Sequence, residues 1–283
     1  MKVRLPLRVP LGGLAYRDAV LLEGPAGWGE WSPLPGYPCD PAVCRRAAEE
    51  AATGPWPAPV RQVVRVNALV PAVGPDEAAA LAGGQADVKV KVGDPGDVDR
   101  VAAVRDAIGP HGRIRVDANG AWDVDTAVRR IAALAPYDLE LVEQPVASLE
   151  DLAGVRRKVA VPVAADECVR GVDDARRLAS LEAADALVVK VQPLGGMAAT
   201  LGVIDAAGVP AIVSSMYETS VGLAAGLALA AALDDLPFAC GLGTAALFAA
   251  DVVAEPLLPV DGMMAVRRPA PDPALLVRYG VDA

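Results

Sequence analysis

Histidine is almost absent from this chain of 283 residues, in which His111 is the only one. It lies in the segment GPHGR, between a helix-like stretch and the strand-like run that follows, and we expect it at the surface. A Ser-His-Asp triad is therefore excluded, and so is a histidine general base. Proton transfer in this protein has to use another kind of side chain.

Cysteine is also scarce, and its four positions match no zinc-binding pattern and no CxxC redox pair. These positions are Cys39, Cys44, Cys168 and Cys240. The N-terminal segment MKVRLPLRVPLGG lacks the apolar stretch of a signal peptide. We therefore expect reduced thiols and a cytoplasmic location.

Positive charge is deficient, with a formal net charge of -10. Nucleic acid is therefore not an expected partner, because phosphate binding needs a basic face. The most apolar run, Val221 to Leu233, is shorter than the roughly 20 residues that cross a bilayer, and it predicts a buried helix. A small-molecule carboxylate remains the expected partner, and the sequence leaves monomer and homo-oligomer equally open.

Short apolar runs rich in β-branched residues recur about every 25 residues. Eight such runs are expected as strands: 63–70, 87–93, 113–119, 139–145, 161–167, 186–193, 210–216 and 237–243. Helix-patterned stretches lie between them, for example 94–109, 123–135 and 171–183. This alternation predicts an α/β fold with a parallel sheet, and eight units favour a (β/α)8-type TIM barrel. A doubly wound sheet is disfavoured, since no G-x-G-x-x-G follows a strand.

The first 60 residues do not follow this repeat. They contain strand and turn patterns, followed by a helical pattern near residues 39–53. We expect a small α+β capping domain over residues 1–60, with residues 263–283 packing back on it. The barrel is then expected over residues 61–262, carrying the active site.

Three expected strands in succession end in a carboxylate: Asp117, Glu143 and Asp166. In a barrel of this kind the active site lies at the C-terminal ends of the strands. Neighbouring strands lie about 5 Å apart, so bare carboxylates at matched positions would repel one another. A divalent cation relieves that repulsion, and all-oxygen ligands favour Mg²⁺, with Mn²⁺ as a substitute. The alternative is that each acid caps the helix that follows.

Lysine is rare, since the 26 basic residues are nearly all arginine. Lys89, Lys91 and Lys190 nevertheless lie in apolar strand patterns, and the first two point to the same face of their strand. Burial and neighbouring cations can lower the pKa of a lysine, which suits it to act as a base. Lys91 is the predicted base and Lys89 is expected to support it. The alternative is that Lys89 and Lys91 only pair with the carboxylates.

Two later turns are candidates for binding a carboxylate. Ser214 and Ser215 open the segment SSMYETS, which leads into the apolar helix, and Gly241 begins GLGT. Backbone N–H groups at a helix start bind anions, and glycine permits close backbone approach. Ordinary βα turns are the alternative at both places.

The order of these motifs resembles the enolase superfamily, in its muconate-lactonising branch. The motifs are K-x-K, D-A-N, E-Q-P, D-E and a single later lysine, and GWGEWSPLPGYP near the start is similar to the capping domain of that branch. The resemblance implies a modified (β/α)7β barrel and a metal-stabilised enediolate, with Lys91 and Lys190 on opposite faces of the substrate. It also implies that Asn119, Ser214, Ser215 and Gly241 bind substrate.

Within that branch, SSMYETSVGL and GLGT are most similar to the o-succinylbenzoate synthases. This implies Mg-dependent dehydration of 2-succinyl-6-hydroxy-2,4-cyclohexadiene-1-carboxylate in menaquinone biosynthesis. Lys91 would remove the proton and then protonate the departing hydroxide, while Lys190 would stabilise the anionic intermediate. An N-acylamino acid racemase or a cycloisomerase is the alternative, because both lysines are present. A barrel that binds metal without catalysis is the alternative of another class.

Overall fold

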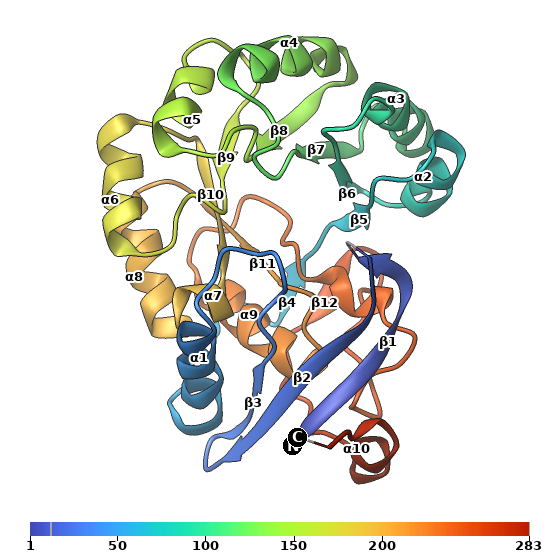
Figure 1. The fold of residues 1–283 in the computed structure, drawn as a ribbon, viewed down its shortest axis with the longest axis vertical. Coiled ribbons are helices and arrows are strands. Elements are labelled where there is room, and N and C mark those ends of the chain that lie inside the picture. The colour runs from blue at the N-terminus through green and yellow to red at the C-terminus, as the bar shows by residue number, and fades with distance from the viewer. Residues whose placement is uncertain (12, 283) are drawn as a thin grey trace.

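The structure is a computed structural model that describes residues 1–11 and 13–282. Its central element is a parallel sheet of seven strands that curls upon itself, with helices on the outside (Figure 1). In sheet order the strands are β11 (Ala211–Ser214), β10 (Ala186–Lys190), β9 (Val163–Ala165), β8 (Leu139–Glu143), β7 (Arg113–Asp117), β6 (Asp87–Lys91) and β5 (Ala68–Val70). The predicted α/β barrel class is confirmed.

Helices connect the strands and cover the outer face of the sheet. They are α2 (Pro75–Ala82), α3 (Asp97–Ile108), α4 (Val124–Leu134), α5 (Leu149–Arg156), α6 (Val172–Leu181), the short α7 (Val191–Leu194), α8 (Met197–Ala207) and α9 (Ser220–Ala232). Small residues let α9 pack closely, and it is buried along almost all its length. Within the described ranges, no helix combines the length and the apolar character that a membrane crossing requires.

The eighth predicted strand differs from the expectation. Residues 237–243 form no strand, and only two bridges stand in its place: Cys240 with Val66, and Gly241 with Ser214. The segment PFACGLG starts with proline and holds two glycines, which weaken a strand. These two residues still join the first and last strands of the sheet, since the Gly241 amide donates to Val213 and the Cys240 carbonyl accepts from Asn67.

The first predicted strand, 63–70, is broken into two elements. β4 (Val63–Arg65) pairs with β12 (Met263–Ala265) in an antiparallel ribbon outside the barrel sheet, and β5 alone belongs to the parallel sheet. The break falls at Val66 and Asn67, where the chain turns toward the bridge with Cys240. Asn67 is therefore placed at the start of the first barrel strand.

The N-terminal region is an antiparallel three-stranded sheet with one helix: β1 (Lys2–Leu11), β2 (Leu14–Gly24), β3 (Gly27–Trp31) and α1 (Pro41–Thr53). α1 packs on β3 so closely that a Cβ at Gly29 would lie 1.9 Å from the carbonyl oxygen of Ala48. α10 (Pro273–Tyr279) lies beside β1, and the two chain ends meet where Val281 donates to the Lys2 carbonyl (Figure 1). The predicted domain boundaries at residues 61 and 263 stay predictions.

A buried polar network joins the N-terminal sheet to the barrel. Glu30 on β3 accepts hydrogen bonds from the amide and hydroxyl of Thr219 and from the Gly222 amide, at the start of α9. Ser32 donates to the same carboxylate at 2.7 Å. Burial raises the pKa of Glu30 to about 7, although the hydrogen bonds from Thr219 and Ser32 act in the opposite direction. The Glu30 carboxylate lies at the positive end of the α9 dipole, which favours its ionised form, but burial still makes ionisation costly.

We expect Glu30 to make stability depend on pH. Its pKa rises from 4.5 to about 7 on folding, so its contribution is complete below about pH 4.5 and is lost as the pH rises to about 7. For a buried group this amounts to roughly 3 kcal/mol. Urea denaturation at pH 5 and pH 8 should show a smaller loss for Glu30→Gln than for the parent protein. Equal losses in the two proteins would contradict this assignment.

Candidate active site

The predicted charged residues meet at the C-terminal ends of β6 to β10. Lys91 lies opposite Asp117, and Asp117 lies opposite Glu143, so three neighbouring strands end at one level. Asp166 follows β9 directly, and Lys190 ends β10. Because the carboxyl ends of parallel strands share one edge, the register alone brings these side chains together.

A cavity opens at this edge of the sheet, with about 600 Å³ of empty space when the solvent at its mouth is included. Nine of the ten predicted site residues line it, and Glu143 does not. The lining residues are Leu34, Tyr37, Asn67, Leu69, Lys89, Lys91, Asp117, Asn119, Asp166, Glu167, Lys190, Ser214, Ser215, Met216, Tyr217, Gly241, Gly243 and Thr244. Charged side chains occupy one side, and uncharged ones occupy the side formed by residues 214–217 and 241–244.

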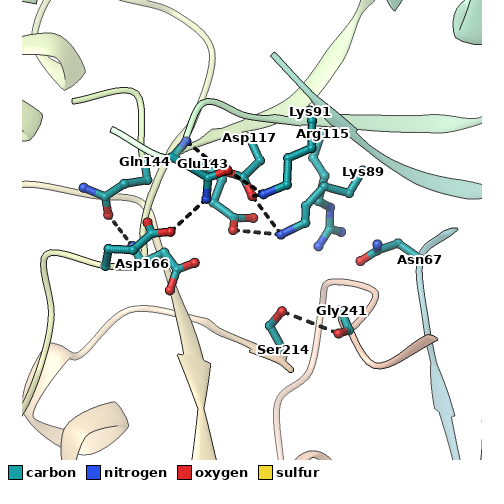
Figure 2. A network of polar contacts seen from close by, with 12 residues as sticks. Asn67, Lys89, Lys91, Arg115, Asp117, Glu143, Gln144, Asp166, Ser214 and Gly241 are labelled. Atoms are coloured by element: carbon teal, nitrogen blue, oxygen red, sulfur yellow. Dashed lines mark hydrogen bonds and ion pairs between the residues drawn. The ribbon is translucent and has the colours of Figure 1, made fainter. Parts of the chain in front are cut away.

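Each predicted carboxylate contacts a lysine ammonium group, and Figure 2 shows these contacts for Asp117 and Glu143. Lys89 Nζ lies 3.1 Å from Asp117 Oδ2 and 2.9 Å from Glu143 Oε1. Lys91 Nζ lies 2.6 Å from the same Asp117 oxygen. On the other side of the cavity, Lys190 Nζ contacts both carboxylate oxygens of Asp166. The lysines of β6 therefore neutralise one part of the site and the lysine of β10 another.

Burial and charge have opposing effects in this cluster. Burial alone would lower the pKa of Lys89, but the carboxylates of Glu143 and Asp117 outweigh it and raise that pKa. Burial would raise the pKa of Asp117, yet Lys91 and Lys89 hold it far below its usual range. Burial, reinforced by the Asp117 charge, raises the pKa of Glu143 to about 8. At Glu143, burial and the Asp117 charge therefore outweigh the ammonium group of Lys89.

The donor chemistry suits a hard cation, although the side chains are not arranged around one point. Within the described part of the chain, no three acidic, histidine or cysteine side chains converge as a metal-binding group. Instead the lysines occupy the space next to Asp117, Glu143 and Asp166. Beside Asp166, the buried Oε2 of Glu167 has no hydrogen-bond partner among residues 1–11 and 13–282. Negative charge in excess, and oxygen donors alone, are what a divalent cation would bind.

Two residues in left-handed backbone conformation hold the strand ends. Asn119 has φ 46° and Gln144 has φ 39°. Asn119 accepts from Lys91 at 2.6 Å and donates to Glu167 at 2.8 Å, so it links the two sides of the acid cluster. Gln144 accepts a hydrogen bond from the Asp166 amide at 2.7 Å and fixes the start of that turn. The sequence pattern singled out Asn119, but Gln144 was read only as part of E-Q-P.

The predicted Ser214, Ser215 and Gly241 lie together on the uncharged side. The Ser215 hydroxyl donates to the Gly241 carbonyl at 2.8 Å and lies 2.9 Å from the Thr244 hydroxyl. A Cβ at Gly241 would lie 2.5 Å from Ser214 Oγ, so only glycine permits this approach. The missing side chain keeps this part of the cavity open.

Tyr37 was not predicted, and it reaches the site from the N-terminal region. Its hydroxyl donates to Asp166 Oδ1 at 2.9 Å and accepts from Lys190 Nζ at 3.2 Å. The Lys190 ammonium also lies 4.6 Å from the centre of the tyrosine ring. The Pro-Gly-Tyr-Pro turn in GWGEWSPLPGYP was the available signal, but composition does not show where such a turn projects.

Comparison with known proteins identifies both regions of the chain. Residues 74–271 match the family model described as "Enolase C-terminal domain-like", and residues 2–52 match "Enolase N-terminal domain-like". The o-succinylbenzoate synthase of Thermobifida fusca is 55% identical over 93% of this chain and 86% of its own length. That of Mycolicibacterium smegmatis is 47% identical over 97% of this chain and 87% of its own length.

Solved structures show the same fold at low identity. A muconate lactonizing enzyme from Pseudomonas fluorescens superposes with TM-score 0.87 and 21% identity, covering 99% of this chain and 97% of its own. An N-succinyl Arg/Lys racemase from Bacillus cereus superposes with TM-score 0.86 and 20% identity, covering 99% and 96%. At this identity the likeness concerns architecture alone.

The pairing of Lys190 with Asp166 should be measurable as stability. In buffer with a chelator, Lys190→Met leaves a buried carboxylate without its ammonium partner, and we expect a loss of about 3–5 kcal/mol in the free energy of unfolding. The double variant Lys190→Met/Asp166→Asn should recover most of that loss. Urea denaturation of all four proteins of this cycle measures the coupling. Additive effects of the two substitutions would rule out a direct interaction.

Proposed function

The chain belongs to the o-succinylbenzoate synthases of the enolase superfamily, and from that premise we propose how its residues dehydrate 2-succinyl-6-hydroxy-2,4-cyclohexadiene-1-carboxylate to o-succinylbenzoate. The chain is accordingly an enzyme, a carbon–oxygen lyase. One observation supports the mechanism above all. Lys91 and Lys190 come from β6 and β10, four positions apart in the sheet order, and both line one cavity with the acids between them.

Enolase-superfamily enzymes generally use a divalent metal. In this chain Asp117, Glu143 and Asp166 would hold it, and their oxygen donors support Mg²⁺, with Mn²⁺ as a substitute. Once bound, the ion supplies a positive charge that binds the substrate carboxylate and stabilises the charge that develops there. Lys89, buried against two of these acids, contributes further positive charge at the same place.

Lys91 is the proposed base. Its side chain keeps 24% of its accessible surface, which leaves the amine reachable from the cavity. It removes the proton from the carbon next to the carboxylate, and the electron pair of that C–H bond passes into the enediolate. As the ring becomes aromatic, the C–O bond breaks and hydroxide departs with its electron pair. Lys91 returns the proton to that hydroxide, and water leaves.

Lys190 acts as a fixed cation on the opposite side of the cavity. Burial would lower its pKa, but Asp166 and Tyr37 outweigh that effect and raise the pKa well above its usual value. Its side chain is 7% exposed, against 24% for Lys91, and a buried cation in this place suits electrostatic stabilisation. Dehydration needs one base and racemisation needs one on each face, so racemisation is the alternative function.

The uncharged side of the cavity is the proposed place for the second substrate arm. Ser214, Ser215 and Gly241 supply hydroxyl and backbone groups there, and Asn119 orders the side of the reacting carboxylate. The proposal also includes a step in menaquinone biosynthesis and a cytoplasmic location. Four free thiols support that location, because reducing compartments keep cysteines unpaired.

We expect Lys91→Ala to lose turnover while keeping fold and metal affinity. General acid–base catalysis contributes roughly 10²–10⁴-fold to rate, so kcat should fall by at least that factor. Lys158→Ala is a matched control, because Lys158 is exposed and lies outside the cavity. Steady-state kinetics with the cyclohexadiene substrate measures turnover, circular dichroism measures the fold, and calorimetry with Mg²⁺ measures the metal affinity. Normal turnover of Lys91→Ala would eliminate the proposed base.

Removal of divalent ions should abolish dehydration, and added Mg²⁺ should restore it. The parent protein is assayed with the cyclohexadiene substrate and with N-succinylamino acids, each with and without EDTA. We expect metal-dependent loss of the hydroxyl from the first and much slower racemisation of the second. Asp117→Asn should lower Mg²⁺ affinity in calorimetry. Turnover that persists in EDTA, or racemisation as the faster reaction, would overturn the proposed function.

A further inference from the structure

Asn67 carries a buried acceptor that nothing in the described chain satisfies. The residue lies between β4 and β5 and is 4% exposed. Its amide nitrogen donates to the neighbouring Ala68 carbonyl at 3.0 Å, which leaves the Oδ1 atom on the other side of the amide. In the part of the chain that the structure describes, this oxygen has no hydrogen-bond partner, and the residue lines the cavity of the active site. In Figure 2 its side chain points toward the space between Lys89 and Gly241.

Other donors that line the same cavity are already engaged. Ser215 donates its hydroxyl to the Gly241 carbonyl, and Ser214 has its hydroxyl directed at the same oxygen. The ammonium group of Lys89 contacts Asp117 and Glu143. A buried acceptor left without a donor is costly, so native structures rarely keep one without a use. A cavity-lining oxygen in that state is suited to a donor that arrives with the ligand.

Resting on the function proposed above, we propose that Asn67 determines specificity by accepting a hydrogen bond from the hydroxyl group of a hydroxy-acid substrate. A carboxylate cannot fill this role, because it offers only acceptors. The substrate hydroxyl is a donor, and it sits on the ring carbon next to the one that bears the reacting carboxylate. Asn67 directly precedes β5, and β5 pairs with β6, the strand that carries Lys89 and Lys91.

This contact also separates substrate from product. When the C–O bond breaks, the hydroxide takes the proton from Lys91 and leaves as water, and o-succinylbenzoate retains no hydroxyl on its ring. The product therefore leaves Asn67 Oδ1 unsatisfied again. The Asn67 side chain therefore contributes to binding of the substrate and not to binding of the product. Such differential binding limits inhibition by product.

The test compares substrate and product in Asn67→Leu, which keeps the approximate shape of the side chain and removes the acceptor. A neutral hydrogen bond is worth roughly 3- to 10-fold in binding. We expect KM for the hydroxy-acid substrate to rise by about that factor, while the inhibition constant of o-succinylbenzoate changes less than about twofold. Leu69→Val is the control, because Leu69 lines the same cavity and its side chain has no hydrogen-bond acceptor. This substitution should shift both constants together.

Three results would overturn the inference. Equal rises in both constants would mean that Asn67 only packs against the ligand, and no change in either would mean that a water satisfies Oδ1. If Asn67→Leu does not fold, Asn67→Ala replaces it in the experiment. We then expect the same result, a rise in KM for the substrate without a matching rise in the inhibition constant of the product. An Asn67→Ala protein that shows no such difference would also reject the role.

A binding experiment keeps this inference distinct from the proposed function. Calorimetry with Mg²⁺ compares 2-hydroxycyclohexane-1-carboxylate with cyclohexane-1-carboxylate, which differ only by the hydroxyl. The parent protein should prefer the hydroxy acid, and Asn67→Leu should lose that preference. If dehydration is absent but the preference and its loss are observed, the proposed function fails and the role of Asn67 stands. If dehydration occurs without any preference, the role of Asn67 fails alone.

Discussion

Lys91, Asp117 and Glu143 share one level because β6, β7 and β8 pair in register. A slip of one residue would turn every side chain of a strand to the opposite face, so the register decides whether the charges meet at all. The helices outside and the apolar strands between them serve that alignment. Everything else in the site, from the lysine contacts to the turns after each strand, follows from where these strands end.

The cluster is held together by compensation between groups that would each be costly alone. Four acidic residues and three lysines line or adjoin one cavity, and the carboxylates of Asp117 and Glu143 are almost fully buried. Replacing a buried ion pair with packed hydrophobic groups is often neutral or stabilising, so stability alone does not account for these charges. Tyr37 adds a contribution from the N-terminal region, so the site is complete only when that region sits on the barrel. The carboxylate of Glu30 also holds the N-terminal region on the barrel, because it accepts a hydrogen bond from Thr219.

The periodic runs were enough to predict the alternating α/β architecture, because hydrophobic spacing reports directly on strands and helices. They were not enough for the last strand, where PFACGLG keeps only two bridging residues. The proximity of Lys91, Asp117 and Lys190 was predictable, because the C-terminal ends of barrel strands lie at one edge of the sheet. Tyr37 and the free oxygen of Asn67 were not, because each depends on a turn whose direction only tertiary packing determines. An asparagine inside the apolar run VVRVNALV was the one available signal.

The seam of the barrel at Cys240 and Gly241 has a consequence for how such a cavity can change. A full strand would tie the uncharged wall to the sheet along its whole length, whereas two bridges attach it at a single level. Substitutions or insertions after Gly241 can therefore reshape the wall that meets the variable part of a ligand, while the charged strand ends stay in place. The charged strand ends that carry the chemistry and the wall that contacts the rest of the ligand thus lie on separate parts of the fold.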